Sequence, residues 1–293
     1  MMRFDDGFFW SRDGIRLHYR DYAGPADRPV LVCLPGLTRN CRDFEGVAER
    51  LAGQWRLVCP DMRGRGDSGY APDPLSYTPL VYMQDIEAMV AALSLERIVF
   101  LGTSLGGLLT MFLAGPLKDR IAGAMLNDIG PTLEAVGLQR IAGYVGKIGP
   151  WPTWVHLARH LAATGADVFP KFDLTQWLVF AKRVACVQPS GRIVLDYDPR
   201  IAEPFRMPNG AAGVADLWPA FEALAGVPSL SLRGTLSDLL TAETQAEMAR
   251  RNPDMAIVTV PDVGHAPTLD EPESIAAIDA LLARVLAARA AAA

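Results

Sequence analysis

The chain has 293 residues, of which half are hydrophobic, and a formal net charge of −5 at pH 7. This length fits one large α/β domain with an insertion, and the charge, with no basic block, argues against a nucleic-acid partner. No window approaches the roughly 18 apolar residues that cross a bilayer, and MMRFDDGFFW lacks the pattern of a secretory signal, so we expect no membrane attachment.

The predicted elements begin with a hairpin, because two strand-like runs in residues 8–22 surround Asp13-Gly14. Short apolar runs then predict buried parallel strands at 30–34, 56–60, 97–102, 122–126, 228–232 and 256–260. Helical stretches lie between them, for example at 79–94, 105–114 and 241–251. Because strand and helix alternate, we expect a doubly wound, mostly parallel sheet of the α/β class.

The alternation stops after residue 130. From Pro131 to about Gly213 the chain is helical and loop-like, which predicts a helical cap over 131–213, inserted between core segments 1–130 and 214–293. The cap carries three tryptophans that are candidates for binding an apolar or aromatic part of a substrate, with packing in the core as the alternative. They are Trp151, Trp154 and Trp177.

The cysteines indicate neither a disulfide framework nor a metal centre. Cys33, Cys41, Cys59 and Cys186 form no C-x-x-C pair, and no histidine lies near them at the spacing of zinc ligands. We therefore expect buried reduced thiols, no metal and no organic cofactor, and a cytoplasmic protein.

The segment GTSLG, residues 102–106, joins a predicted strand to a predicted helix. Gly-x-Ser-x-Gly at such a junction predicts a tight turn that presents Ser104 as a nucleophile, with glycines where side chains would collide. One alternative is a phosphate-binding loop, although the segment lacks Gly-Lys-Ser/Thr and the G-x-G-x-x-G spacing. The other is a glycine-rich turn with an incidental serine.

A serine hydroxyl needs a general base, and the chain has four histidines. His18 lies in the N-terminal hairpin and is expected at a surface or an edge. His156 and His160 lie one helical turn apart and fit a polar helix face. His265 follows the strand at 256–260 in the loop PDVGHAPTLDEP. Because loops at the C-terminal ends of parallel strands carry the chemistry of such sheets, His265 is predicted as the general base.

The base needs a carboxylate to orient it, and two aspartates follow core strands. We predict Asp238, in TLSDLLT, as this acid. Asp128, in LNDIGP, is the alternative acid, and otherwise a polar residue at the entry to the cap. The developing oxyanion needs backbone donors, for which we predict the N–H groups of Leu105 and Leu37. Pro35 has no N–H to donate.

The chain resembles the α/β-hydrolase family over nearly its whole length. The motifs LPGLTRN, DMRGRGDSG, GTSLGG, the SD at 237–238 and GHAP stand in the family's order. The resemblance implies an eight-stranded sheet, a Ser–His–Asp triad in the order Ser104, Asp238, His265, and a mobile cap. It also implies that Arg63 and Asp67 brace the loops of the active site.

The predicted function is hydrolysis of a carboxylic ester or lactone through an acyl-enzyme. The similarity is greatest to bacterial esterases, lactonases and related hydrolases of small acids, so the expected partner is a small-molecule ester or lactone with an apolar or aromatic part. One alternative is a carbon–carbon bond hydrolase of the same fold, although such relatives usually carry a tryptophan where Ala266 follows His265. Another is a ligand-binding protein that keeps the triad but turns over slowly.

Overall fold

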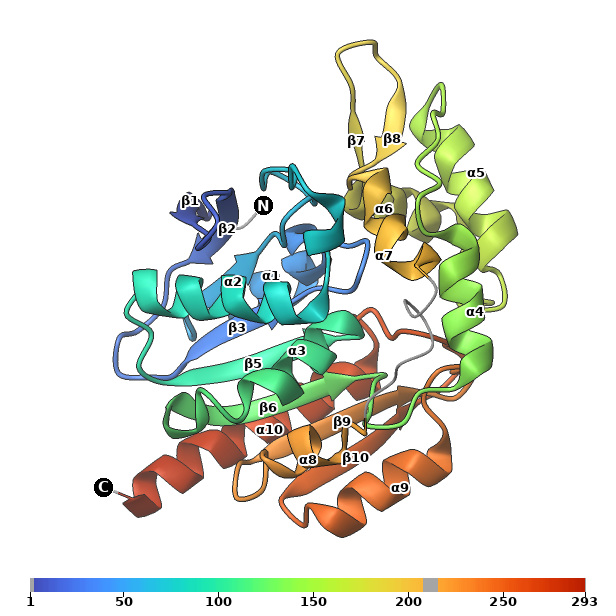
Figure 1. Cartoon of the computed structure of the whole chain (residues 1–293). Coiled ribbons are helices and arrows are strands. Elements are labelled where there is room, and N and C mark those ends of the chain that lie inside the picture. The colour runs from blue at the N-terminus through green and yellow to red at the C-terminus, as the bar shows by residue number, and fades with distance from the viewer. Residues whose placement is uncertain (1–2, 208–215, 293) are drawn as a thin grey trace.

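The computed structural model describes residues 3–207 and 216–292, built around a mixed sheet of eight strands (Figure 1). In spatial order the strands are β1 (Asp5–Trp10), β2 (Arg16–Tyr22), β4 (Leu57–Pro60), β3 (Val30–Leu34), β5 (Ile98–Thr103), β6 (Ile121–Asn127), β9 (Ser229–Gly234) and β10 (Met255–Val260). The hairpin β1–β2 and the pair β2–β4 are antiparallel, and all the other pairs are parallel. The predicted doubly wound, mostly parallel sheet of eight strands is confirmed.

Helices cover both faces of the sheet. They are α1 (Glu45–Leu51), α2 (Pro79–Ala92), α3 (Leu105–Leu113), α8 (Trp218–Glu222), α9 (Ala242–Arg251) and α10 (Pro272–Ala292). Side chains of β3 alternate between the two faces, as the pleat of a strand requires. Val32 and Leu34 pack with α2, α3 and α8, whereas Leu31 and Cys33 pack with α1 and α10. These strands therefore read as continuous apolar runs in the sequence.

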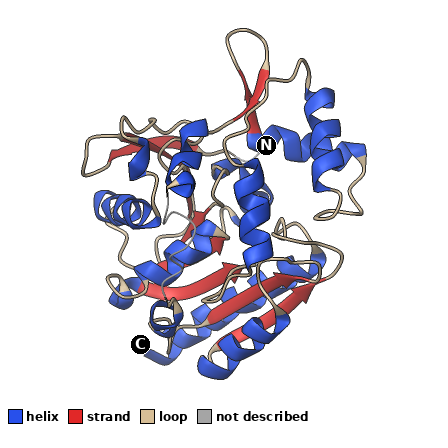
Figure 2. Ribbon diagram, turned by 45° about the vertical axis from the view of Figure 1, so that its right-hand side comes forward, coloured by secondary structure: helices blue, strands red, loops and turns tan. Residues whose placement is uncertain are grey.

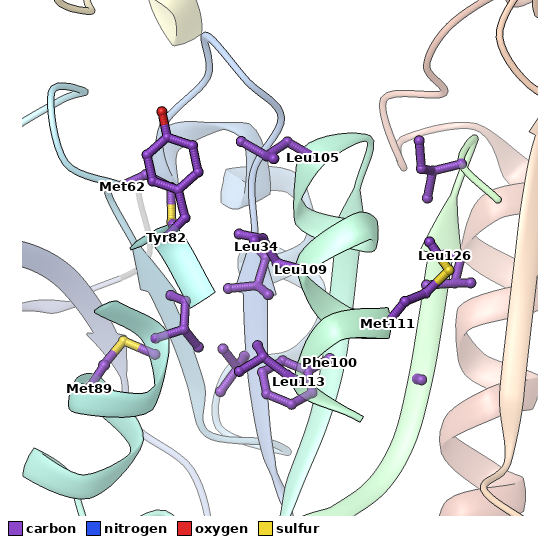
Figure 3. Close-up of a cluster of buried hydrophobic side chains, with 14 of the residues drawn as sticks. Leu34, Met62, Tyr82, Met89, Phe100, Leu105, Leu109, Met111, Leu113 and Leu126 are labelled. Atoms are coloured by element: carbon purple, nitrogen blue, oxygen red, sulfur yellow. The ribbon is translucent and has the colours of Figure 1, made fainter. Parts of the chain in front are cut away.

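Figure 3 shows part of the cluster under α3. Leu34 and Phe100 of the sheet lie against Leu109 and Leu113 of that helix, and all four are fully buried. Close packing of this kind fixes the helix against the strands from which it leaves. The turn between β5 and α3, which contains Ser104, is thereby held in place.

The described residues between β6 and α8 hold four α-helices and a small hairpin, on the side of the sheet to which the parallel strands point (Figures 1 and 2). The helices are α4 (Ala135–Tyr144), α5 (Trp154–Gly165), α6 (Leu174–Val184) and α7 (Glu203–Arg206), and the hairpin is β7 (Ala185–Val187) with β8 (Ile193–Leu195). The expectation of helices and loops missed this hairpin, which turns at Gly191 with φ +77°. None of these described residues joins the central sheet.

The boundaries of the cap stay predictions. The expected end at Gly213 and the expected restart of the core at residue 214 fall within 208–215, outside the described residues. No helix in the described part of the chain is long and apolar enough to cross a membrane. All four cysteines are free thiols, of which Cys186 alone is half-buried and the other three are buried.

Arg63 connects three parts of the core. Its fully buried guanidinium pairs with Asp85 of α2 and with Asp13 of the N-terminal hairpin turn. Asp67, in contrast, is exposed, and only its backbone N–H takes part in the network, donating to Asp61. Of the two residues expected to brace the active-site loops, Arg63 therefore fits the expectation and Asp67 does not. The buried carboxylate in this turn is that of Asp61.

Replacing Arg63 by methionine is expected to lower the free energy of unfolding by about 3–5 kcal/mol, because Asp85 would stay buried without its partner. Urea denaturation followed by circular dichroism measures this change. The matched control is Arg12→Met, which breaks the exposed pair with Glu87 and should cost less than about 1 kcal/mol. Equal losses in the two variants would contradict the assigned role of Arg63.

Candidate active site

Ser104 occupies the sharp turn between β5 and α3. Its backbone φ of +52° lies in the left-handed region, which is strained for a residue with a side chain. The flanking glycines are required by space: a Cβ on Gly102 would lie 2.4 Å from the carbonyl oxygen of Gly106, and one on Gly106 would lie 2.0 Å from that of Leu34. The turn predicted from Gly-x-Ser-x-Gly therefore has its expected shape.

A chain of hydrogen bonds connects Ser104, His265 and Asp128. Nε2 of His265 lies 2.8 Å from Oγ of Ser104, and Nδ1 lies 2.8 Å from Oδ2 of Asp128. The imidazole is 6 % exposed and the Asp128 carboxylate is fully buried. A carboxylate can only accept, so Nδ1 donates to Asp128 and leaves Nε2 free to accept the proton of Ser104.

The structure corrects the predicted acid, because Asp238 does not contact His265. Its carboxylate instead forms a bidentate ion pair with Arg140 of α4, and one of the two hydrogen bonds measures 2.8 Å. The Arg140 guanidinium holds the pKa of Asp238 below its usual value. Asp238 lies four positions beyond the end of β9, where the chain has already turned toward the cap.

Asp128 is held at the carboxyl edge of the sheet by its neighbours. It follows β6 directly, with a backbone φ of +54°, and its N–H donates to the carbonyl of Leu232. The carboxylate accepts from the N–H of Gly234 at 2.8 Å and from the hydroxyl of Ser237 at 2.6 Å. These two donors fix the orientation of the carboxylate beside His265. The sequence analysis missed Ser237, whose only signal was its place in the loop after β9.

Asn127 also contributes, and the sequence analysis missed it too. Its side-chain amide donates to the carbonyl of Pro267 at 2.9 Å and to the hydroxyl of Thr103 at 3.1 Å. It thus ties the loop that holds His265 to the turn that holds Ser104. The Asp128 side chain and the loop that carries His265 are thus both held by residues outside the hydrogen-bond chain.

The loop after β3 lies against Ser104. A Cβ on Gly36 would lie 3.7 Å from Cβ of Ser104, and Leu37 and Leu105 both line the cavity beside it. Neither N–H donates a hydrogen bond to any residue that the structure describes. The buried Arg65 holds this loop from behind, because its Nε donates to the carbonyl of Leu37 at 2.8 Å.

A cavity of about 690 Å³ opens over Ser104 and His265. Its deeper wall is aromatic, with Phe169 and Phe180 packed edge-on against Trp177. Of the three candidate tryptophans, only Trp177 lines this cavity, whereas Trp151 and Trp154 are half-buried against the hydrophobic cluster to which Trp177 belongs.

The remaining histidines lie outside the proton path. His160 lines the cavity and His156 is exposed. His18 is fully buried in β2, contrary to the expected surface or edge position, and its two ring nitrogens face Asp61 and Asp6.

One group of side chains in the described residues has the spacing of a metal site. Ligand atoms of His18, Cys41 and Asp61 lie within 4.8 Å of one another. The Asp61 carboxylate already accepts from His18 and from the backbone N–H groups of Cys41 and Asp67. These hydrogen bonds account for the cluster as a buried polar network that ties β2 to the loops after β3 and β4.

Comparisons with known proteins agree with this geometry. The sequence profile described as "Alpha/beta hydrolase family" matches residues 31–278. A "3-hydroxybutyrate-oligomer hydrolase" of Cupriavidus necator is 41% identical over 89% of this chain and 90% of its own length. A "2-(acetamidomethylene)succinate hydrolase" of Mesorhizobium japonicum is 26% identical over 81% of each chain. The crystal structure of an alpha/beta hydrolase from Novosphingobium aromaticivorans, at 56% identity, superposes with a TM-score of 0.93 over 97% of this chain and 99% of that one.

Proposed function

Because the chain belongs to the alpha/beta hydrolase family and is a hydrolase, we propose that it cleaves carboxylic esters through an acyl-enzyme on Ser104. The observation that carries this proposal is the unbroken hydrogen-bond chain from Ser104 through His265 to Asp128. Nucleophile, base and orienting carboxylate have the mutual geometry that acyl transfer needs.

In the proposed mechanism, Oγ of Ser104 attacks the ester carbonyl carbon while Nε2 of His265 takes the hydroxyl proton. The N–H groups of Leu37 and Leu105 receive the oxyanion that forms, which fits their lack of other partners among the described residues. Collapse breaks the bond to the alcohol, and His265 returns its proton to the leaving oxygen. Water, activated by His265, then releases the acid and restores Ser104. Asp128 stabilises the imidazolium in both steps.

Short linear oligomers of 3-hydroxybutyrate are the first substrates to test. The name of the Cupriavidus necator relative gives such oligomers as its substrate, and its identity to this chain extends over most of both proteins. The aromatic and aliphatic wall of the cavity fits their apolar methyl and methylene groups. Lactones of the same hydroxy acid contain the same type of bond and belong in the same panel.

The test compares two esters that share an acyl group but differ in their alcohol, hydrolysed in the presence of hydroxylamine. A common acyl-enzyme should give the same ratio of hydroxamate to free acid from both esters, together with steady turnover. A ratio that changes with the alcohol would contradict the acyl-enzyme. A single stoichiometric release without turnover would instead identify a ligand-binding protein, and cleavage of β-diketones but of no ester would identify a carbon–carbon bond hydrolase.

A further inference from the structure

One wall of the cavity carries positive charge. Arg140, Tyr144 and Lys147 all line the cavity, and they come from α4 and the turn that follows it. Arg140 and Tyr144 are four residues apart, which places their side chains on one face of the helix, and Lys147 follows three residues later. This segment, unlike the buried aromatic wall, is open to solvent: Tyr144 is 42 % exposed and Lys147 is exposed.

Arg140 is held in place but keeps donors free. Its Nε and Nη2 bind the carboxylate of Asp238, and no described residue accepts from its Nη1. Asp238 is itself anchored, since its backbone carbonyl accepts from the N–H of Gly137 at the start of the same helix. The hydrogen bonds that Arg140 donates to the Asp238 carboxylate raise the pKa of Arg140, and the negative charge of Asp128 adds to this shift. The guanidinium is thus fixed within electrostatic reach of the triad.

Lys147 lacks any such acidic partner. It forms no ion pair with a described residue. Arg206 lies close to the neighbouring Gly146, since a Cβ on that glycine would be 3.7 Å from its Nη2, and it too forms no ion pair with a described residue. The segment 208–215, outside the described residues, contains no aspartate or glutamate in its sequence. Neither Lys147 nor Arg206 is therefore neutralised by an ion pair with a described residue.

The other cations that line the cavity are also paired: Arg183 with Asp270, and Arg39 with Asp43. Arg39, in the loop after β3, forms a bidentate pair with Asp43 and lies over the ring of Phe180. Both members of that pair line the cavity, so they cancel in charge. Among the described Arg and Lys residues that line the cavity, Lys147 is therefore the one without an ion-pair partner, and it lies just beyond α4.

From this arrangement we infer that the substrate is an ester with a free carboxylate, and that Arg140 and Lys147 bind this carboxylate while the ester bond lies at Ser104. The inference rests on the proposed ester hydrolysis and adds to it the substrate's charge and the residues that recognise it. A guanidinium fixed by Asp238 needs little reordering to bind an anion, and the unpaired ammonium of Lys147 attracts it from solution. Asp238 is then a positioning residue for Arg140.

The test uses a matched pair of substrates: the linear dimer of 3-hydroxybutyrate and the same dimer with its carboxylate capped as the primary amide. The two differ only in the negative charge. The wild-type kcat/KM for the free dimer is expected to exceed that for the capped dimer by about 10- to 100-fold, as charge-assisted hydrogen bonds provide. Equal values for the two dimers would overturn the inference.

Variants then assign the preference to residues. Arg140→Met and Lys147→Met should each reduce the ratio of the two kcat/KM values about tenfold. Arg140→Lys keeps the positive charge and should reduce the ratio less. Lys147→Glu should bring the ratio near or below one. Lys118→Glu, which makes the same change of net charge in the exposed turn before β6, should leave the ratio unchanged. An unchanged ratio in both Arg140→Met and Lys147→Met would contradict the assignment.

A binding experiment separates this inference from the proposed function. The Ser104→Ala variant should bind the free dimer at least tenfold more tightly than the capped dimer in isothermal titration calorimetry, and the further change Lys147→Glu should abolish the difference. If the wild type cleaves no ester but this difference in binding persists, the proposed function fails and the anion site stands. If esters are cleaved but the two dimers bind equally, only the anion site fails.

Discussion

Replacing Ser104 by alanine is expected to lower kcat for ester hydrolysis by about 10⁴-fold or more, because no other group can take the acyl group at this position. His265→Ala should cost about as much. The double variant should be little worse than either single variant, since nucleophile and base act as one unit. Steady-state rates with one good ester, measured on each purified variant, check all three expectations.

The control for this prediction is Ser190→Ala, in the exposed turn of the β7–β8 hairpin, which should keep full activity. Circular dichroism and thermal melting confirm that each variant is folded. Alanine carries a Cβ just as serine does, so the substitution leaves the strain of the positive φ at position 104 unchanged. The fold of Ser104→Ala should therefore match the wild type. A cleanly folded Ser104→Ala enzyme with more than a tenth of wild-type activity would contradict the mechanism.

Asp128→Asn is expected to lower kcat by about 10³- to 10⁴-fold, because the amide can donate to Nδ1 of His265 and so favours the tautomer that cannot accept from Ser104. Asp238→Asn breaks the ion pair with Arg140 but leaves the contact between His265 and Asp128 intact. It should cost no more than about tenfold in kcat. Rates of the two variants with the same neutral ester measure the difference.

The ranking of these two variants is the informative result. Both replace a carboxylate by an amide of the same size, so each serves as the size-matched control for the other. A larger loss of kcat in Asp238→Asn than in Asp128→Asn would mean that the hydrogen bond from His265 to Asp128 is not the one used in turnover. Thermal melting separates this outcome from a loss of fold, since Asp128 is the more deeply buried of the two.

The central strands could be predicted from sequence because both of their faces are buried. Runs such as VLVCL at 30–34 have no polar position, and the structure places them within one or two residues of the predicted ends. The hairpin of β7 and β8 could not be predicted in this way. Each of its strands has three residues, and their pairing with each other is extended only by an isolated bridge from Ile193 to Trp151. Both strands are therefore shorter than a typical core strand.

The proposed nucleophile and base could be chosen from local sequence, whereas the carboxylate that contacts His265 could not. Ser104 lies in the Gly-x-Ser-x-Gly turn directly after β5, and His265 is the one histidine in a loop that follows a core strand, five residues beyond the end of β10. The choice between Asp128 and Asp238 depends on the backbone at each position. Asp128 adopts a positive φ that turns its carboxylate toward His265, and Asp238 follows three further loop residues and meets Arg140. Neither the φ angle nor the partner in α4 has a signature in the sequence.

Trapping the acyl-enzyme tests the account most directly. Wild-type enzyme is mixed with a 3-hydroxybutyrate ester, quenched in acid at times that span the first turnover, and digested with trypsin. The peptide of residues 98–118, which contains Ser104, should gain the mass of one acyl group, with fragmentation placing it on Ser104. The adduct should decay at the rate of turnover and be absent from Ser104→Ala. Steady turnover with this peptide unmodified at every time point, or with the acyl group on another residue, would contradict the account.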